Sequence, residues 1–552
     1  MKIVTTSKII VLCGAIVIAS LCASRAGGHD HTLEAFLKAR RVARGRAAAR
    51  VEAPAALYSQ HGSCQLTIEL FDSTTKEPLP GLVRVTAIEE GTSVGLAELI
   101  HRRLDWYAMP ARATVTVPQT KLKLEALHGL DTETLEHDVD LTGLEKADVK
   151  LPLQRFYSAA AKGLRSGNTH LHLMGLTHAE ADRYLQVVPM ADGLDLLYVS
   201  YLRRLPDELP AEQNYISNRF TTEDLKRLSQ DGVLFGNGEE HRHNFGRGGE
   251  GYGHVMFLDI RKLIRPVSIG PGIMRTGTDG IPLQRGIQAA RGDGAAVIWC
   301  HNDLGFEDVP NWMAGLLDAQ NIFDGGHHGS YTDTFYRYLN LGMHVPFSTG
   351  TDWFIYDFSR VYVPIQGELS SKVWLRTLAE GRSFITNGTF LEFHVGTSRV
   401  GDTIAMAGAG TLEVQGRGIG RLDFQKIELV QNGEVVHATD SHPVAGHFEA
   451  SMTFALNIRE PGWIALRIPL DAGQSELGRP LYAHTSPIYI DLAGKRIFRP
   501  QIAEELIAEI ERNIEVIKQK AIFANDQERQ SVLKVHDEGT ATLRKRLQAH
   551  GR

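Results

Sequence analysis

The chain has 552 residues, of which 43% are hydrophobic and 22% are charged, and its formal net charge is -6 at pH 7. This length exceeds what one ordinary hydrophobic core supports, and the composition excludes a disordered chain or a coiled coil. The slightly negative charge offers no basic surface for nucleic acid. We therefore expect a multidomain globular protein that does not bind nucleic acid.

Residues 1–26 have the pattern of a secretory signal peptide. The stretch MKIVTTSKIIVLCGAIVIASLCASRA runs from a lysine-bearing start through an apolar region to small residues. A membrane anchor is the alternative, but the apolar run is shorter than the ~20 residues that a spanning helix needs. A lipoprotein signal at Cys22 is disfavoured because Leu21 stands where a small residue is wanted. We expect an exported protein, periplasmic or extracellular, without stable membrane insertion.

Residues 27–58 form an alanine- and arginine-rich lead-in, which we interpret as a helix or an exposed arm. Residues 59–158 contain short alternating runs such as CQLTIELFD and GLVRVTAI, separated by turns such as KEPLPG. This pattern predicts an N-terminal β-sandwich. Cys64 and Cys300 remain once the signal is removed, and they provide no disulfide framework.

The sequence pattern changes in residues 159–396, where apolar strand-like runs alternate with helical stretches. The runs include LDLLYVSYL, GVLFGNGEE, HVMFLD and AAVIWCHND, and helical stretches include IPLQRGIQAARGDG. Such alternation predicts βα units around a parallel sheet or barrel. Polar clusters follow the strands directly, which is where barrel enzymes carry their chemistry.

Residues 397–496 return to β-type patterns and predict a C-terminal β-sandwich. The segment KIELVQNGEVVHAT is typical of a hairpin with Asn432 and Gly433 at its turn. Residues 497–552 predict a helical tail, because apolar residues recur at helical spacing. These residues are Ile502, Leu506, Ile510, Ile514 and Ile517.

The motif GNTHLHL contains His170 and His172, whose side chains should project from one face of a strand within ~7 Å of each other. Such a pair forms a clamp for a metal ion, although hydrogen bonds within a core could also explain it. Further imidazoles and carboxylates stand at other strand ends. They are Glu240, His254, His301 and Asp352.

Neutral imidazole and carboxylate are ligands that suit Zn, Mn or Fe, and a bound divalent ion can activate water for hydrolysis. Some neighbouring polar residues have simpler interpretations. Glu239 could be solvated, His327 and His328 could lie on a loop surface, and Asp303 could cap a helix.

The order of these motifs resembles the polymerase and histidinol phosphatase (PHP) superfamily, in particular its branch of carbaryl-hydrolase-like metallohydrolases. The matching pieces are GNTHLHL, GNGEE followed by GH, WCHND and STGTD, and then RVYV and LAEGRSFITNG. The resemblance implies a distorted (β/α)7 barrel with a metal centre at the C-terminal ends of its strands. The flanking β-sandwich domains and the helical tail are similar to those of longer exported members.

The resemblance also implies roles for individual residues. His170 and His172 match the first ligand pair, and Glu240 matches a carboxylate that can bridge metals. His301 matches a later ligand, Asp352 the final carboxylate, and His254 the GH motif. The chain departs from the family at Tyr201 and Leu202, where an Asp-His pair is usual, and at Phe354, where a His is common. We therefore expect one or two ions.

The sequence predicts an exported metal-dependent hydrolase that acts on an ester, phosphoester, carbamate or amide bond of a small molecule. Asp352 or Glu240 would orient the attacking water or accept its proton. Tyr201 would line the substrate pocket, and Arg242 and Arg360 could contact an anionic group, although solvated arginines are the simpler alternative. The competing hypothesis is a non-catalytic periplasmic or surface binding protein with a degenerate PHP barrel. The oligomeric state stays open.

Overall fold

The computed structural model describes residues 57–173, 176–200, 221–229, 232–245, 251–274, 276–300, 305–326 and 329–550. It is a mixed α/β structure with about 25% helix and 39% strand, and its C-terminal end is helical. The predicted signal peptide and most of the lead-in lie outside the described residues. Among the helices of the described ranges, none combines the length and the apolarity needed to cross a membrane.

The N-terminal β region consists of two sheets that share one core. In the first, β1 (Ser63–Asp72) lies between β6 (Arg112–Pro118) and β9 (Lys146–Leu153). The second has the order β4 (Ile100–His101), β5 (Tyr107–Met109), β2 (Gly81–Ala87), β7 (Lys121–Leu127) and β8 (Leu135–Asp140), with β3 (Thr92–Ser93) on β2. Alternate residues of β1 are buried, so the period of two in its sequence reflects one face on the core.

The central region is built on strands that follow one another along the chain. They are β10 (Leu164–His172), β11 (Leu196–Ser200), β12 (Leu234–His243), β13 (Gly253–Leu258), β14 (Ser268–Ile269), β15 (Ala296–Trp299), β16 (Ala319–Asn321), β17 (Phe347–Ser348), β18 (Asp352–Trp353), β19 (Arg360–Pro364) and β20 (Phe384–Thr386). β10, β11 and β12 pair in parallel, as do β15, β16 and β17.

The sheet is mixed rather than purely parallel. β13 runs antiparallel to both β12 and β15, because the chain turns back after β12 as a hairpin. β18 pairs in parallel with β10, and only residues 349–351 separate it from β17. The strand set that begins with β10 therefore returns to β10.

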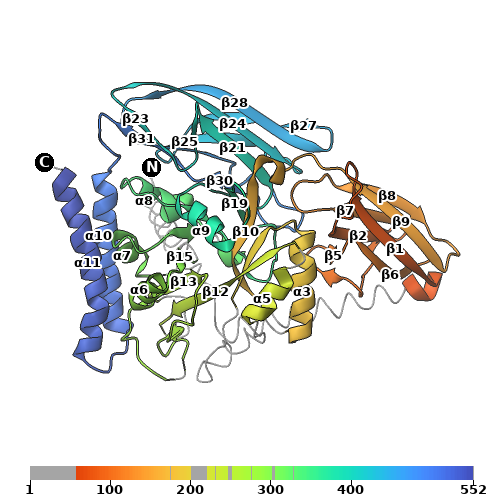
Figure 1. The fold of residues 1–552 in the computed structure, drawn as a ribbon, viewed down its shortest axis with the longest axis horizontal. Helices are drawn as coiled ribbons and strands as arrows, with labels where there is room; N and C mark the ends of the chain where they lie inside the picture. Colours follow the sequence, from red (N-terminus) through yellow and green to blue (C-terminus); the bar gives the residue numbers. More distant parts are fainter. Residues whose placement is uncertain are drawn as a thin grey trace, which may run out of the picture.

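Helices surround these strands (Figure 1). They are α3 (His178–Ala191), α5 (Thr222–Leu228), α6 (Leu283–Asp293), α7 (Asp308–Met313), α8 (Arg337–Leu339) and α9 (Ser371–Ala379). α3 begins at a capping box in which Thr177 and Glu180 satisfy each other's backbone N–H groups. α5 begins in the same way with Thr221 and Asp224.

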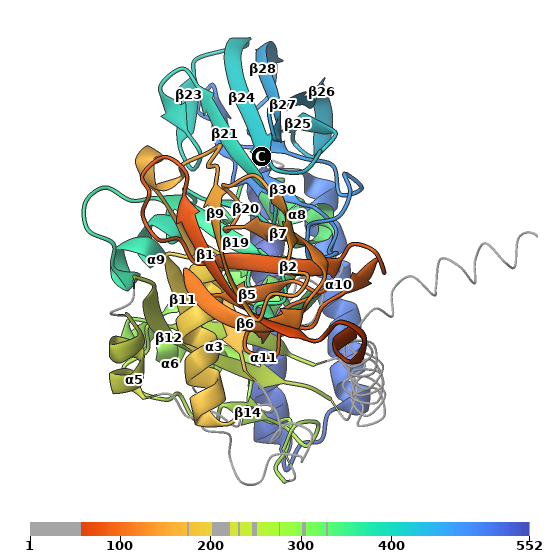
Figure 2. The same ribbon diagram turned by 90° about the vertical axis from the view of Figure 1, so that its right-hand side faces the viewer.

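The C-terminal β region joins the central sheet through β20 and β30 (Ala483–Thr485). With β30, β23 (Thr403–Met406), β25 (Lys426–Gln431), β26 (Glu434–Asp440), β29 (Gly462–Arg467) and β31 (Ile488–Leu492) extend that sheet. A separate sheet has the order β22 (Ser398–Arg399), β21 (Thr389–Val395), β24 (Gly410–Gly420), β28 (His447–Ile458) and β27 (His442–Val444). Figure 2 shows this region above the central strands, with the N-terminal strands in front.

Two local predictions for the C-terminal half are confirmed. β25 and β26 form the expected hairpin, and Asn432 and Gly433 adopt φ values of 53° and 103° at its turn. The tail forms α10 (Pro500–Lys520) and α11 (Asp526–His550), which lie side by side (Figure 1). Leu506 and Ile510 of α10 are buried in the core cluster that includes the central strands.

Candidate metal centre

His170 and His172 occupy the C-terminal end of β10, and both side chains are fully buried. Their Nε2 atoms lie 2.9 Å apart. Nδ1 of His170 lies 2.7 Å from a carboxylate oxygen of Asp324, which can only accept a hydrogen bond when ionised. Nε2 of a neutral His170 must then present its lone pair to His172. Two imidazole nitrogens brought this close need a shared proton or a cation between them.

Asp352 reaches the histidine pair because its own segment runs along β10. Leu171 pairs with Asp352 in parallel register, and the backbone N–H groups of Thr351 and Phe354 donate to the carbonyls of His170 and His172. Oδ1 of Asp352 lies 3.5 Å from Nε2 of His170 and 3.6 Å from Nε2 of His172. This backbone pairing therefore fixes one carboxylate beside both imidazoles.

The backbone around Asp352 is unusual. Asp352 adopts a φ of 55°, in the left-handed region that few residues other than glycine occupy. Two residues earlier, Gly350 lies so close to β10 that a Cβ atom there would stand 2.6 Å from Cβ and 2.8 Å from the backbone N of His170. The glycine in STGTD thus allows the close approach, and the strained conformation turns the carboxylate toward the site.

Glu240 lies near the end of β12, and both of its carboxylate oxygens face imidazoles. Oε2 is 3.1 Å from Nε2 of His172, and Oε1 is 2.9 Å from Nδ1 of His254. Nε2 of His254 lies 2.9 Å from Oδ1 of Asn244, so a neutral His254 that donates there presents a lone pair to Glu240. Nη1 of Arg242, on the same face of β12 as Glu240, is 3.7 Å from Oε2.

These donors fit a transition-metal ion. One ligand atom from each of His170, His172 and Glu240 lies within 4.8 Å of the others. Two ligands that each bind Zn at about 2.0–2.1 Å in tetrahedral geometry are roughly 3.4 Å apart, which is close to the spacings measured here. Each oxygen of Glu240 faces a different imidazole, that of His172 or that of His254, an arrangement that could hold one cation or two. The predicted ligands His170, His172, Glu240, His254 and Asp352 are thus brought together.

Asp324 was missed by the sequence analysis. It follows the short strand β16, is fully buried, and also accepts a hydrogen bond of 2.9 Å from Nδ2 of Asn321. Burial lowers the pKa of His170, but the carboxylates of Asp324 and Asp352 raise it, and the net pKa is well above the ordinary value. The surroundings of His170 therefore favour positive charge, whether a proton or a metal ion supplies it.

Cys300 is a second residue that the sequence analysis left without a role at this site. It follows β15 and is fully buried, and burial raises the pKa of its thiol. One ligand atom from each of His170, Cys300 and Asp324 lies within 4.8 Å of the others. Oδ2 of Asp324 lies against Nδ1 of His170 and accepts from Nδ2 of Asn321, as in the carboxylate–histidine pairs that orient metal ligands. Asp324 is therefore best described as a positioning residue.

We expect Asp324→Asn to weaken metal binding by about 10–100-fold, because an amide no longer fixes the tautomer and orientation of His170. Competition with a chelating dye measures the affinity of the purified chain for Zn or Mn. Asp279→Asn is a matched control, since Asp279 pairs with His243 in the same way, at 2.8 Å, but outside the cluster. Equal metal affinities for the two variants would contradict the positioning role.

Arg360, which was expected to contact a substrate, lies away from the cluster. Arg360 is 1% exposed, and its guanidinium donates to the backbone carbonyls of Phe358, Asp192 and Gly193. Gly193 precedes β11, at the end of the strands opposite the histidines. This placement corrects the expected substrate contact and gives Arg360 a structural role. His301 and Tyr201 lie outside the described residues.

Other polar residues of β12 belong to the structural core. Glu239 is fully buried, contrary to the expectation that it is solvated, and its carboxylate accepts a hydrogen bond from the backbone N–H of Ile264 and contacts Nδ1 of His241. Nε2 of His243 contacts Asp279, whose other oxygen accepts from Ile522 between α10 and α11. These residues alternate with Glu240 and Arg242 and face the opposite side of the strand.

The chain was compared with models of protein families, with curated proteins and with solved structures. No family model matches it, and neither a curated protein nor a solved structure gives a significant match.

Proposed function

We propose that this protein is an exported metal-dependent hydrolase of the PHP type. The observation that carries the proposal is the convergence of His170, His172, Glu240 and Asp352, which come from β10, β12 and β18. Imidazoles and carboxylates buried this closely are costly unless they are paired or bind a metal ion. The core pairs His241–Glu239 and His243–Asp279 each join one imidazole to one carboxylate, whereas this group brings two imidazoles and two carboxylates from three strands to one place.

The finer fold proposal is a distorted (β/α)7 barrel with the ligands at the C-terminal ends of its strands. Support comes from the return of the strand set to β10 and from the parallel pairs β10–β11–β12 and β15–β16–β17. The antiparallel strand β13 is the distortion, and it is the element that carries His254 to Glu240. Chemistry at strand C-termini is the general rule for barrel enzymes.

In this proposal His170, His172, Glu240 and Asp352 hold a divalent Zn, Mn or Fe ion, and His254 with Glu240 could hold a second. Such an ion supplies Lewis acidity, which polarises the substrate's carbonyl or phosphoryl oxygen and makes a nearby water more acidic. Asp352, the first residue of β18, orients the attacking water and accepts its proton. Arg242 lies close enough to Glu240 to stabilise its charge or to contact an anionic group of the substrate.

The substrate class is an ester, phosphoester, carbamate or amide of a small molecule. The test is metal analysis of the purified full-length chain together with hydrolase assays in the presence of Zn, Mn or Fe. We expect one or two ions per chain and metal-dependent turnover that falls by at least about 100-fold in Asp352→Ala.

The outcomes separate the proposal from its alternative. A chain without stoichiometric transition metal, whose properties do not change in His170→Ala, would refute the metallohydrolase. A chain that retains its metal but hydrolyses no member of these bond classes would instead favour the binding protein.

A further inference from the structure

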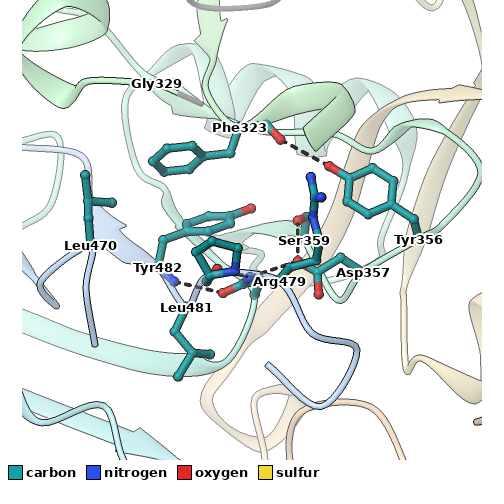
Figure 3. A pocket seen from close by; sticks show the side chains of 11 residues that line it. Phe323, Gly329, Tyr356, Asp357, Ser359, Leu470, Arg479, Leu481 and Tyr482 are labelled. Atoms are coloured by element: carbon teal, nitrogen blue, oxygen red, sulfur yellow. Dashed lines mark hydrogen bonds between the residues drawn. The ribbon is translucent and has the colours of Figure 1, made fainter. Parts of the chain in front are cut away.

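A cavity of about 180 Å³ lies between the central strands and the C-terminal β region (Figure 3). Phe323 and Gly329 come from the loop after β16, Tyr356 from the loop after β18, and Arg479 and Tyr482 from the segment between β29 and β30. Leu470, 41% exposed, lies at the edge of the cavity. The cavity is therefore formed by loops from two regions of the chain and is accessible to solvent.

The walls of this cavity suit a flat apolar group. The rings of Phe323 and Tyr482 lie 4.6 Å apart between centroids and are tilted by 47°, and Figure 3 shows both rings at the cavity. Tyr356 stands on another side, where its hydroxyl donates to the carbonyl of Phe323. An apolar cavity of about 150 Å³ can hold benzene, so the space here accommodates one substituted aromatic ring.

Arg479 brings a positive charge to the cavity. Its guanidinium lies over the ring of Tyr356, 4.8 Å from the centroid, and within the described part of the chain it forms neither an ion pair nor a side-chain hydrogen bond. A guanidinium stacked on an aromatic ring keeps the N–H groups at its edge for a carboxylate or a phosphate. The side chain is therefore oriented by Tyr356 while its donors remain available to a ligand.

The acidic residue of the cavity, Asp357, is engaged in hydrogen bonds within the protein. Its carboxylate accepts hydrogen bonds from Ser359 Oγ (3.2 Å), Asn387 Nδ2 (2.8 Å) and Ser475 Oγ (3.1 Å). Burial raises the pKa of Asp357, whereas the hydrogen bonds from Asn387 and Ser475 and the charge of Arg479 lower it. The oxygens of Asp357 are thus engaged by neutral donors of the protein, and Arg479 is the residue of the cavity that brings positive charge to an anionic ligand.

Residues that line the cavity are close neighbours, in the sequence, of residues of the candidate metal centre. Phe323 directly precedes Asp324, and Tyr356 follows Asp352 on the same loop. The hydroxyls of Tyr482 and Thr349 lie 3.2 Å apart, and Thr169, the neighbour of His170, donates to the carbonyl of Thr349. The same segments therefore position metal-binding residues and the cavity wall.

We propose that this cavity is the substrate-recognition pocket and that it binds an aromatic ring bearing one anionic substituent, with the anion on Arg479 and the ring against the cavity wall formed by Phe323, Tyr356 and Tyr482. This inference rests on the proposed hydrolase only for the statement that the bound group is part of a substrate. Binding itself requires no turnover.

The test is isothermal titration calorimetry of the full-length chain with benzoate, acetate and benzyl alcohol. Benzoate should bind at least 10-fold more tightly than the other two, because only benzoate combines the ring with the charge. In Arg479→Met the affinity for benzoate should fall by about 10–100-fold, the cost of a lost charged hydrogen bond, while that for benzyl alcohol should not change. Acetate carries the charge without the ring, and the acetate binding that remains in Arg479→Met reports carboxylate binding at sites other than Arg479, such as the metal.

Arg376→Met is the matched control, since Arg376 is an exposed arginine of α9 with 69% side-chain exposure. It removes the same charge and should leave all affinities unchanged. Arg479→Gln gives the same information if the Met variant does not fold, as judged by circular dichroism. Equal benzoate affinities in the Arg479 and Arg376 variants, or no preference for benzoate in the unmodified chain, would overturn the pocket assignment.

Failure of the pocket is distinguishable from failure of the hydrolase. A chain that hydrolyses phenyl acetate with metal, but prefers it to 4-acetoxybenzoate, retains the proposed activity and contradicts the pocket. If both proposals hold, kcat/KM should favour 4-acetoxybenzoate by at least 10-fold, and Arg479→Met should remove that preference without lowering the rate on phenyl acetate.

Discussion

Glu240→Gln should remove the bound metal and lower turnover by more than about 100-fold. Loss of a residue that merely supports a ligand costs about 10–100-fold, and Glu240 faces His172 with one oxygen and His254 with the other. The amide keeps the size of the side chain but loses its charge, and its NH2 group would point at one of the two imidazoles. We therefore expect the metal content and the turnover rate to fall, while the protein still folds.

Glu239→Gln is the control for this substitution. Glu239 is the preceding residue on β12, is equally buried, and faces the other side of the strand, where it contacts Ile264 and His241. We expect this variant to keep its metal and its activity, even if its melting temperature falls. Metal content by mass spectrometry and initial rates decide the comparison, and a metal-loaded, active Glu240→Gln protein would contradict the proposed ligand set.

Gly350→Ala should destabilise the protein and separate Asp352 from the histidine pair. A Cβ atom at this position would approach the backbone N of His170 to 2.8 Å, and neither backbone can yield without breaking the pairing of β18 with β10. Overpacking of this kind costs about 1–3 kcal/mol in the free energy of unfolding. We therefore expect a lower melting temperature together with weaker metal binding.

Gly408→Ala is the matched control, because a Cβ atom at Gly408 would meet nothing within 4 Å. Differential scanning calorimetry of the metal-free and metal-loaded proteins separates the two effects of the Gly350 substitution. If Gly350→Ala has the same melting temperature as Gly408→Ala and the same affinity for metal, the close approach of β18 to β10 is not what positions Asp352.

The patterns that predicted parts of the site and of the fold were those whose geometry follows from a short stretch of the sequence. His170 and His172 share a face because side chains alternate along β10, and Asn432–Gly433 predicted its turn because both residues must adopt positive φ. Asp352 was found because polar residues at neighbouring strand ends meet at one edge of a sheet. In each case a short segment contains the physical cause.

Other features depend on contacts between segments that are far apart in the sequence. The pattern of β13 does not reveal that it runs antiparallel, because side-chain alternation is the same in both directions. Asp324 follows a short strand and lies beside His170 only once β16 and β10 have joined the same sheet. Arg360 was expected near a substrate because the sequence shows its charge. The sequence does not show that its guanidinium lies at the opposite end of the strands.

The most direct test of the account is a crystal structure of the metal-loaded chain with anomalous diffraction measured at the Zn, Mn and Fe absorption edges. We predict a peak at about 2.0–2.2 Å from Nε2 of His170, Nε2 of His172 and the carboxylates of Glu240 and Asp352. A fully occupied metal elsewhere in the chain, or these side chains turned away from a common point, would contradict the metal centre.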